Sequence, residues 1–422
     1  MSVNSSTSSS EPGFGRYLAT CLLLAITMLA ALASFNAFVD PYGAFGAPLI
    51  DGVNRFKFGF NHHQRIAKTH ALERHPPATV ILGSSRVASA LDPEHPGFRH
   101  RPVYNLGIDA TGIYEVYRLA QHAQAVRPLD EMVLAVDFYM FNGDWPTQVD
   151  FDESRLAVTV DGKPTGNRVP EMLSLLVSGD VSYESWWSLR HQRAQETHYT
   201  ALGRRDENND DAQILSRGGQ RLVFQASEKR YVTYGYSPQR HGYLMQDKEG
   251  RSPFIWLRRL LDDCRSHGTR VNLVINPVHA RQYEVMAALG LWPAYQDWKR
   301  QVLAATLDEA EAQGSVPYPL WDFGVINDIT TESVPPLGDR VTTMRWYREA
   351  SHFRKVLGDR MLDRMLAEPP VADTPADGFG LRLTPDNIEA QLALQVRRLA
   401  EWQAGHPEDV AEIVQIAAPY RH

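Results

Sequence analysis

Short apolar runs alternate with segments of helical period in two parts of this chain. The runs cover residues 79–83, 103–106, 132–136, 271–275 and 320–323. Between them, apolar residues recur at the three- and four-residue spacing of amphipathic helices, as in 112–126, 253–267 and 295–313. Parallel strands buried on both faces read as continuous apolar runs, and they need crossover helices. The pattern therefore predicts an α/β fold with a doubly wound parallel sheet and helices on both of its faces.

The pattern in the rest of the chain predicts further helices, a large insertion and a C-terminal segment. Helical period also occurs in 64–74, 356–366 and 387–402. From residue 143 to about 250 the strand and helix alternation fails, which predicts a large insertion covering one end of the sheet. We expect the main domain to span residues 40–370, followed by a linker and a C-terminal helix in 371–422.

The N-terminal segment has the pattern of a membrane anchor. Residues 17–39 form a run of 23 residues without a charge, bounded by Arg16 and Asp40. About 20 apolar residues span a bilayer, whereas the core of a signal peptide has about 7–15. Residues 1–16 are predicted to be a disordered cytoplasmic tail, and the rest of the chain is expected on the exported side. A cleaved signal peptide remains the alternative, because Ala31-Leu32-Ala33 resembles a cleavage site.

Charge and composition exclude some classes of function. The net charge is −7 and no basic run occurs, which argues against nucleic-acid binding. The spacing of His62, His63, His70 and His75 does not match a zinc motif, so we predict neither a metal nor a cofactor. The two cysteines do not indicate a compartment.

Candidate chemistry lies where the first strand ends. Reactive groups in open α/β sheets collect beyond the carboxyl ends of the strands, and Ser85 follows residues 79–83 at that edge. Far downstream, Glu349 precedes His352 by three residues, so on a helical turn the two side chains would share a face. A serine needs a base to become a nucleophile, and a carboxylate orients that base. The sequence therefore predicts a triad of Ser85, His352 and Glu349.

Three blocks together resemble the SGNH (GDSL-like) hydrolase and acyltransferase superfamily. They are Gly83-Ser84-Ser85 after the first strand, Asn105-Leu106-Gly107 after the second, and Glu349 with His352 near the end. The resemblance implies that Ser85 is the nucleophile and that the backbone N–H of Gly107 helps to bind an oxyanion. The chain departs from the family in two ways. Glu349 replaces the usual Asp, and the third block, Gly-x-Asn-Asp, is absent after 132–136.

Four residues are predicted to bind the oxyanion or the substrate. Besides Gly107, these are Asn142, which ends the segment after the third strand, Asn276, which leaves the fourth strand, and Arg86 beside the serine. Arg86 could steer an anionic substrate, or it could equally be a surface arginine paired with an acid. Asn276 is also explained by the turn chemistry of Asn-Pro.

The anchored form resembles the branch of that superfamily that works on the bacterial envelope, such as alginate O-acetylation proteins and the teichoic-acid D-alanylation thioesterase. The resemblance implies a single-pass protein of the bacterial inner membrane with its main domain in the periplasm or outside the cell. It would be a serine esterase or O-acyltransferase acting on an acyl ester or polysaccharide, with other envelope proteins as candidate partners. The alternative is a noncatalytic scaffold or glycan-binding component of an envelope assembly.

Overall fold

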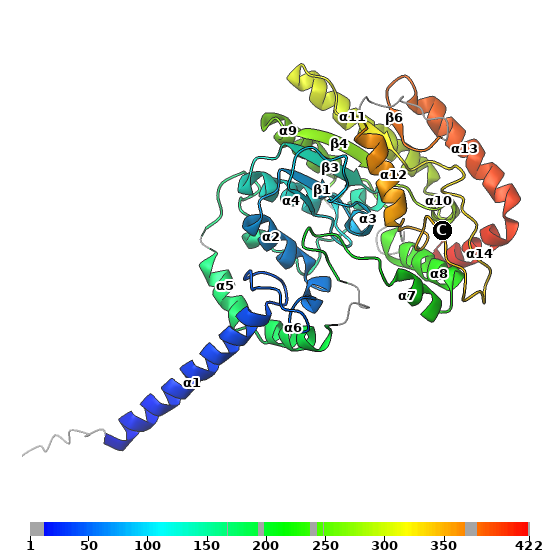
Figure 1. Cartoon of the computed structure of the whole chain (residues 1–422). Coiled ribbons are helices and arrows are strands. Elements are labelled where there is room, and N and C mark those ends of the chain that lie inside the picture. The colour runs from blue at the N-terminus through cyan, green and yellow to red at the C-terminus, as the bar shows by residue number, and fades with distance from the viewer. Residues whose placement is uncertain are drawn as a thin grey trace, which may run out of the picture. The chain divides into compact units, whose positions relative to one another are not determined.

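The computed structural model describes residues 12–166, 168–192, 198–236, 243–247, 249–367 and 378–420 (Figure 1). It contains two compact units. One comprises Met1–His62 and Gly166–Ala194, and the other comprises His63–Thr165 and Gln195–His422. Residues 40–62 and 166–194 were expected in the main domain and its insertion. They group with the N-terminal helix instead. We call the first part the anchor unit and the second, which holds the candidate active site described below, the catalytic unit.

A six-stranded sheet forms the centre of the catalytic unit, in the order β2-β1-β3-β4-β5-β6. The strands are β1 Thr79–Leu82, β2 Val103–Asn105, β3 Glu131–Val136, β4 Arg270–Ile275, β5 Leu320–Asp322 and β6 Leu381–Leu383. The first five are parallel to their neighbours, whereas β6 is antiparallel to β5. The five predicted strands are therefore confirmed in one sheet, and β6 at its edge was not predicted.

The strand order opens a crevice at the carboxyl ends of β1 and β3. From β1 the chain crosses to β2 on one side, and from β2 it returns to β3 on the other side of β1. All residues of β1 and β3 are buried, as their apolar runs require. The connections that follow β1 and β3 therefore run to opposite sides, which leaves a crevice between them. Ligands of α/β proteins bind in such a crevice.

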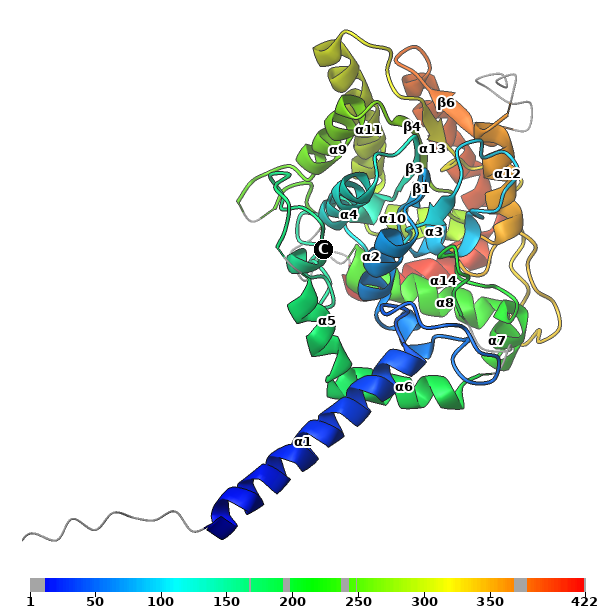
Figure 2. The ribbon, with the colours of Figure 1, turned by 60° about the vertical axis from the view of Figure 1, so that its left-hand side comes forward.

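Helices cover both faces of the sheet. In Figure 2, α4 and α9 lie on one side of the strands and α3 and α12 on the other. The helices of the catalytic unit are α2 Gln64–Arg74, α3 Ser85–Ala90, α4 Ile113–Val126, α7 Asp210–Ser216, α8 Gln220–Arg230, α9 Phe254–Ser266, α10 Ala280–Ala288, α11 Trp292–Gln313, α12 Lys355–Met365, α13 Ile388–Gly405 and α14 Pro407–Ala417. Every helix predicted from period is present, whereas α7, α8, α10 and α14 were not predicted.

The insertion adds no strand to the sheet in its described residues, as expected. Its part in the catalytic unit contributes α7 and α8, and α8 continues into a π-helical turn at Tyr231–Gly235. Its part in the anchor unit forms α5 Val169–Leu176 and α6 Gly179–Arg190.

The anchor unit is built on α1, Pro12–Val39. This helix begins inside the segment that was expected to be disordered, and residues 1–11 of that segment lie outside the described residues. From Phe14 to Val39 the helix is long and apolar enough to cross a membrane, a property that signal sequences share. Asn36 fixes its last turns. The amide Nδ2 of Asn36 donates to Leu176 O at 2.8 Å and to Ser182 Oγ at 2.9 Å.

Candidate active site

Ser85, His352 and Glu349 meet in one hydrogen-bonded chain. Ser85 Oγ lies 2.7 Å from His352 Nε2, and Nδ1 of the same imidazole contacts Glu349 Oε1. The acid and the histidine do not lie on a helical turn as expected. They lie in a bend between the paired residues Tyr347 and Phe353, and Arg348 N donates to His352 O at 2.9 Å. The bend still brings the carboxylate to the side of the imidazole opposite the serine, which is the order that a catalytic triad needs.

The turn after β1 fixes the serine. Ser85 is the first residue of α3, and Ser84 caps that helix because its Oγ accepts from Arg86 N at 3.2 Å. A Cβ atom at Gly83 would lie 2.8 Å from Ala135 O, so only glycine allows this turn to pack against β3. Ser85 Oγ is thereby held at the carboxyl end of the central strands.

Glu349 is held as a carboxylate. Burial alone would raise its pKa, but His352, the Ser227 hydroxyl and the Ser351 backbone N–H together keep the pKa of Glu349 well below its ordinary value. Ser351 Oγ also donates to Glu349 Oε1 at 3.0 Å. An ionised acid at this place accepts the Nδ1 proton of His352, which directs the Nε2 lone pair toward Ser85.

A cavity of about 960 Å³ opens over Ser85, His352 and Glu349. Its walls come from the loops after β2 and β3, from α8 and from the bend that carries His352. The remaining lining residues are Asp109, Ala110, Tyr139, Asn142, Asp144, Trp145, Pro146, Gln148, Arg205, Arg217, Leu222, Val223, Ala226, Ser227, Arg230, Tyr231, Tyr234, Gly235 and Arg348. Aromatic rings and guanidinium groups thus surround the serine, and the insertion supplies most of one wall.

Arg86 does not face this cavity. Its guanidinium is 3% exposed, contacts Asp137, and donates to Ser351 O at 2.8 Å and to Tyr231 Oη at 3.0 Å. Burial opposes the charge, but Asp137 and the nearby tyrosines raise the pKa of Arg86 above its ordinary value. The second of our two interpretations therefore applies in part: Arg86 pairs with an acid, although it is buried rather than on the surface.

Asn276 and Gly107 also lie away from the cavity lining. Asn276 Nδ2 donates to Asp137 Oδ1 at 3.0 Å, so this side chain supports the buried ion pair. The backbone N–H of Gly107 donates to Asn105 Oδ1 at 2.9 Å. A Cβ at Gly107 would lie 2.5 Å from Ala88 N, so this glycine lets the loop after β2 pack against α3. We predicted that both residues would bind the oxyanion or the substrate, but neither lines the cavity.

Lys68 is bonded to the loop at Gly107. Its buried ammonium donates to Gly107 O at 2.5 Å, to Gly203 O at 2.8 Å and to Asn105 O at 3.0 Å. Burial lowers the pKa of Lys68 to about 7. A lysine inside an amphipathic helix is normally taken for a surface residue, so no local pattern indicates this role.

Asn142 is the one predicted binding residue outside the triad that lines the cavity. It follows the 3₁₀-helical turn Phe138–Phe141, and its Oδ1 accepts from Asp144 N at 3.2 Å and from Leu244 N at 3.4 Å. These bonds orient the amide so that Nδ2 has no acceptor among the described residues. Its two N–H donors can therefore serve a ligand.

Asp137 and Ser227 support the triad through hydrogen bonds, and neither was predicted from the sequence. Asp137 accepts from Ser84 Oγ at 2.5 Å, from Arg86 and from Asn276, and thereby ties the serine turn to β3 and β4. An acid directly after a buried strand is a signal that could have been used, since strand ends at this edge face the site. Ser227 lies in α8, and nothing in its sequence context marks it.

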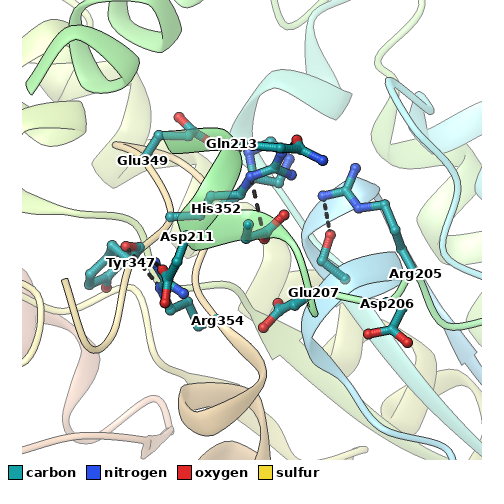
Figure 3. A network of polar contacts seen from close by, with 12 residues as sticks. Arg205, Asp206, Glu207, Asp211, Gln213, Tyr347, Glu349, His352 and Arg354 are labelled. Carbon is teal, nitrogen blue, oxygen red and sulfur yellow. Dashed lines mark hydrogen bonds and ion pairs between the residues drawn. The ribbon is translucent and has the colours of Figure 1, made fainter. Parts of the chain in front are cut away.

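The insertion is bonded to the bend that carries the histidine. Arg354 Nη2 donates to Asp211 Oδ1 at 2.6 Å, and both residues are labelled in Figure 3. The Nε of Arg348 lies 3.4 Å from Asp210 Oδ2. Gln220 Nε2 donates to Arg348 O at 2.6 Å. Residues far apart in the sequence therefore hold the base of the triad.

We expect Ser227→Ala to reduce ester turnover by about tenfold, because a hydrogen bond to a charged group is worth roughly 1.5–3 kcal/mol. The loss should appear in kcat rather than in KM, since Ser227 acts through Glu349. Steady-state kinetics would measure it, with Ser216→Ala, an exposed serine of α7, as the matched control. Equal kinetics for the two variants would contradict this role.

The stability of the protein should depend on pH through Glu207. Burial, aided by the Asp210 carboxylate, raises the pKa of Glu207 to about 7 from its ordinary 4.5. Between these values the folded protein holds a proton that the unfolded chain has lost, so stability falls as pH rises from about 4.5 to 7. Glu207→Gln should therefore have a higher melting temperature than the parent at pH 8, with a smaller difference at pH 5. A difference that does not change with pH would contradict this account.

Among the described residues, no group of three or more His, Cys, Asp or Glu side chains could hold a metal ion. No protein-family model matches the sequence, and no curated protein matches it significantly. The geometry of the site therefore carries the functional argument.

Proposed function

We propose that this protein is a membrane-anchored, exported serine esterase or O-acyltransferase. Its substrates would be acyl groups of an envelope or extracellular polysaccharide. The observation that carries the proposal is the chain from Ser85 through His352 to Glu349, which opens into a large cavity. A serine bonded to an imidazole whose second nitrogen is held by a buried carboxylate is the arrangement that acyl transfer requires.

The strand order and the positions of the site residues support the proposal that the protein is an enzyme of the SGNH type. The order β2-β1-β3-β4-β5 is that of flavodoxin-like sheets. Ser85 follows β1, Gly107 follows β2, and His352 precedes the helix α12, as in the resemblance stated above. Asp137 occupies the place after β3 where the third block of that superfamily would stand.

The proposed reaction has two steps. Ser85 Oγ attacks the acyl carbonyl carbon while its proton moves to His352 Nε2, and Glu349 stabilises the imidazolium. The tetrahedral intermediate then expels the alcohol, which takes the proton back from Nε2. The acyl group stays on Ser85. Water or the hydroxyl of an acceptor next loses its proton to His352 Nε2 and attacks the acyl carbonyl carbon. The bond to Ser85 Oγ then breaks, Ser85 Oγ takes the proton from Nε2, and an acid or a new ester leaves.

Two donors are available for the oxyanion. The backbone N–H of Ser85 is at the start of α3, where helical N–H groups lack intrahelical partners. The second is Asn142, which lines the cavity and whose Nδ2 has no acceptor among the described residues. Removal of one such donor costs about 3 kcal/mol of transition-state stabilisation in serine hydrolases.

The lining and the volume of the cavity favour a saccharide over a small ester as the natural substrate. Trp145, Tyr139 and Tyr234 line it, and aromatic faces provide apolar contact area for the C–H faces of sugar rings. A volume of about 960 Å³ lies at the upper end of ordinary ligand sites.

One observation favours a noncatalytic scaffold or glycan-binding component as the second candidate. The backbone N–H of Gly107, which would bind the oxyanion in the resembled superfamily, is engaged by Asn105. If Ser85 and Asn142 supply too little stabilisation, the same cavity would bind an acylated glycan without cleaving it.

We infer the location from α1. Its exposed apolar surface fits a single span of the bacterial inner membrane, with the catalytic unit in the periplasm or outside the cell. Substrates and any partner envelope proteins would then be met on the exported side.

Hydrolysis of p-nitrophenyl acetate by the purified full chain tests the proposal. An acyl-enzyme predicts a burst of p-nitrophenol close to one equivalent per protein, followed by slower turnover. Addition of a polysaccharide acceptor should speed the slow phase if the protein is a transferase. Absence of both the burst and turnover, together with binding of an acylated glycan, would favour the scaffold.

A further inference from the structure

The anchor unit exposes apolar side chains outside α1. Among its described residues, seven large apolar side chains are exposed beyond that helix: Leu49, Ile50, Val169, Leu173, Val177, Tyr183 and Trp186. They belong to the loop after α1 and to α5 and α6. Exposed apolar groups that gather in one small unit mark an interaction surface, whereas scattered single ones do not.

Helix α5 and the residue that follows it carry an exposed apolar face. Val169, Leu173 and Val177 follow one another at four-residue spacing and are 54%, 57% and 45% exposed. Pro170 and Ser174 are the other exposed residues of this face. A helix that faced water would carry charged side chains here. This one presents a face with a single polar residue.

Helix α6 adds the composition of a membrane interface. Tyr183 and Trp186 are 59% and 44% exposed, and the guanidinium of Arg190 lies 4.7 Å from the ring centroid of Trp186. Tyrosine, tryptophan and basic side chains concentrate where the hydrocarbon of a bilayer meets the headgroups. This composition favours a lipid surface over a second protein chain.

The three apolar segments are attached to one end of α1. Asn36 bonds α5 and α6 through Leu176 O and Ser182 Oγ, and Asn54 Nδ2 donates to Phe38 O at 2.9 Å, which holds the loop of Leu49 and Ile50. Figure 1 shows α5 and α6 beside this end of the helix. About 20 helical residues cross the hydrocarbon, so a span that starts at Tyr17 reaches its far boundary near Asn36. The attached segments therefore lie at the level of the headgroups.

We propose that α5, α6 and the loop of Leu49 and Ile50 form a collar around the end of α1 that is embedded in the headgroup region of the same bilayer. The inference rests on the membrane span of the proposed function but not on the esterase chemistry. The collar would give the anchor unit a second, in-plane attachment, as interfacial helices do.

Spin labels on the full chain in phospholipid nanodiscs test the collar. Leu173→Cys carries the label on α5, Leu23→Cys reports the span, and Val341→Cys is the control on the catalytic unit, where Val341 is 86% exposed. Cys21→Ser removes the exposed native thiol, and Cys264 is buried. Power saturation compares collisions with O₂, which concentrates in lipid, with those of a water-soluble nickel complex.

The collar predicts that the label at Leu173 collides more with O₂ than with nickel, at a shallower depth than the label at Leu23, whereas Val341 shows the reverse. A water-like label at Leu173 together with a deep label at Leu23 would overturn the collar and leave the span intact. Water-like labels at both positions would overturn both. Dipolar coupling between Leu173 labels on two copies would show that a second chain covers the face, and would also overturn the collar.

Discussion

Ser85→Ala is expected to reduce p-nitrophenyl acetate turnover to the uncatalysed background. In serine hydrolases, loss of the nucleophile costs about 10⁶-fold in kcat, because the remaining groups cannot form the acyl intermediate. His352→Ala should be nearly as severe, since triad members act as a unit and their losses are not additive. Turnover is followed by p-nitrophenol absorbance with matched protein concentrations.

Two substitutions of the same chemical kind serve as controls. Ser154→Ala removes an exposed hydroxyl and His267→Ala removes an exposed imidazole, both within the catalytic unit, and neither should change turnover. The loss of turnover in Glu349→Gln should be smaller than in Ser85→Ala by roughly tenfold or more. Glu349 orients the histidine and stabilises its charged form, but it does not exchange a proton with the substrate. Parent-like turnover in Ser85→Ala would contradict the mechanism.

Asp137→Asn is expected to lower the free energy of unfolding by about 3–5 kcal/mol, since removal of one partner of a buried ion pair leaves the other charge uncompensated. Arg86 is 3% exposed and would lose its counter-charge. Chemical denaturation of the parent and the variant would measure the loss. Because Asp137 also accepts from Ser84 Oγ, the serine turn should loosen and turnover should fall as well.

An exposed pair provides the control for that prediction. Asp308 lies 3.3 Å from Arg258 on the surface, so Asp308→Asn should change stability by less than about 1 kcal/mol. The double variant Asp137→Leu with Arg86→Met should be more stable than Asp137→Asn alone, because no charge is left buried. Equal free energies of unfolding for Asp137→Asn and Asp308→Asn would show that the buried ion pair is not needed for stability.

The sequence predicts the sheet well because the signal there is local. β1, β3 and β4 each come from a continuous apolar run, and burial on both faces leaves no other arrangement for such runs. β6 escaped prediction because Leu381–Leu383 is only three residues long and alternates, as a half-buried edge strand does. Helix α5 escaped it because it has only eight residues, fewer than the window of about 11–18 residues over which a helical period can be recognised.

The site was predictable as far as it depends on position along the chain. Ser85 and His352 were found because a strand end and a late acid-histidine pair fix where they lie. The role of Arg86 was not predictable, because its partner Asp137 is 51 positions away and only the fold shows that both are buried. Ser227 and Lys68 act through contacts with residues more than 30 positions away, which no local pattern reveals.

The most direct test of the account is the covalent labelling of Ser85. A fluorophosphonate reacts with a serine only when a neighbouring base activates it. After incubation of the full chain and proteolysis, mass spectrometry should find the phosphonyl adduct on Ser85, and the adduct should be absent from His352→Ala. Labelling of another residue, or no label on Ser85 in a chain that hydrolyses p-nitrophenyl acetate, would contradict the assignment of Ser85 as the nucleophile.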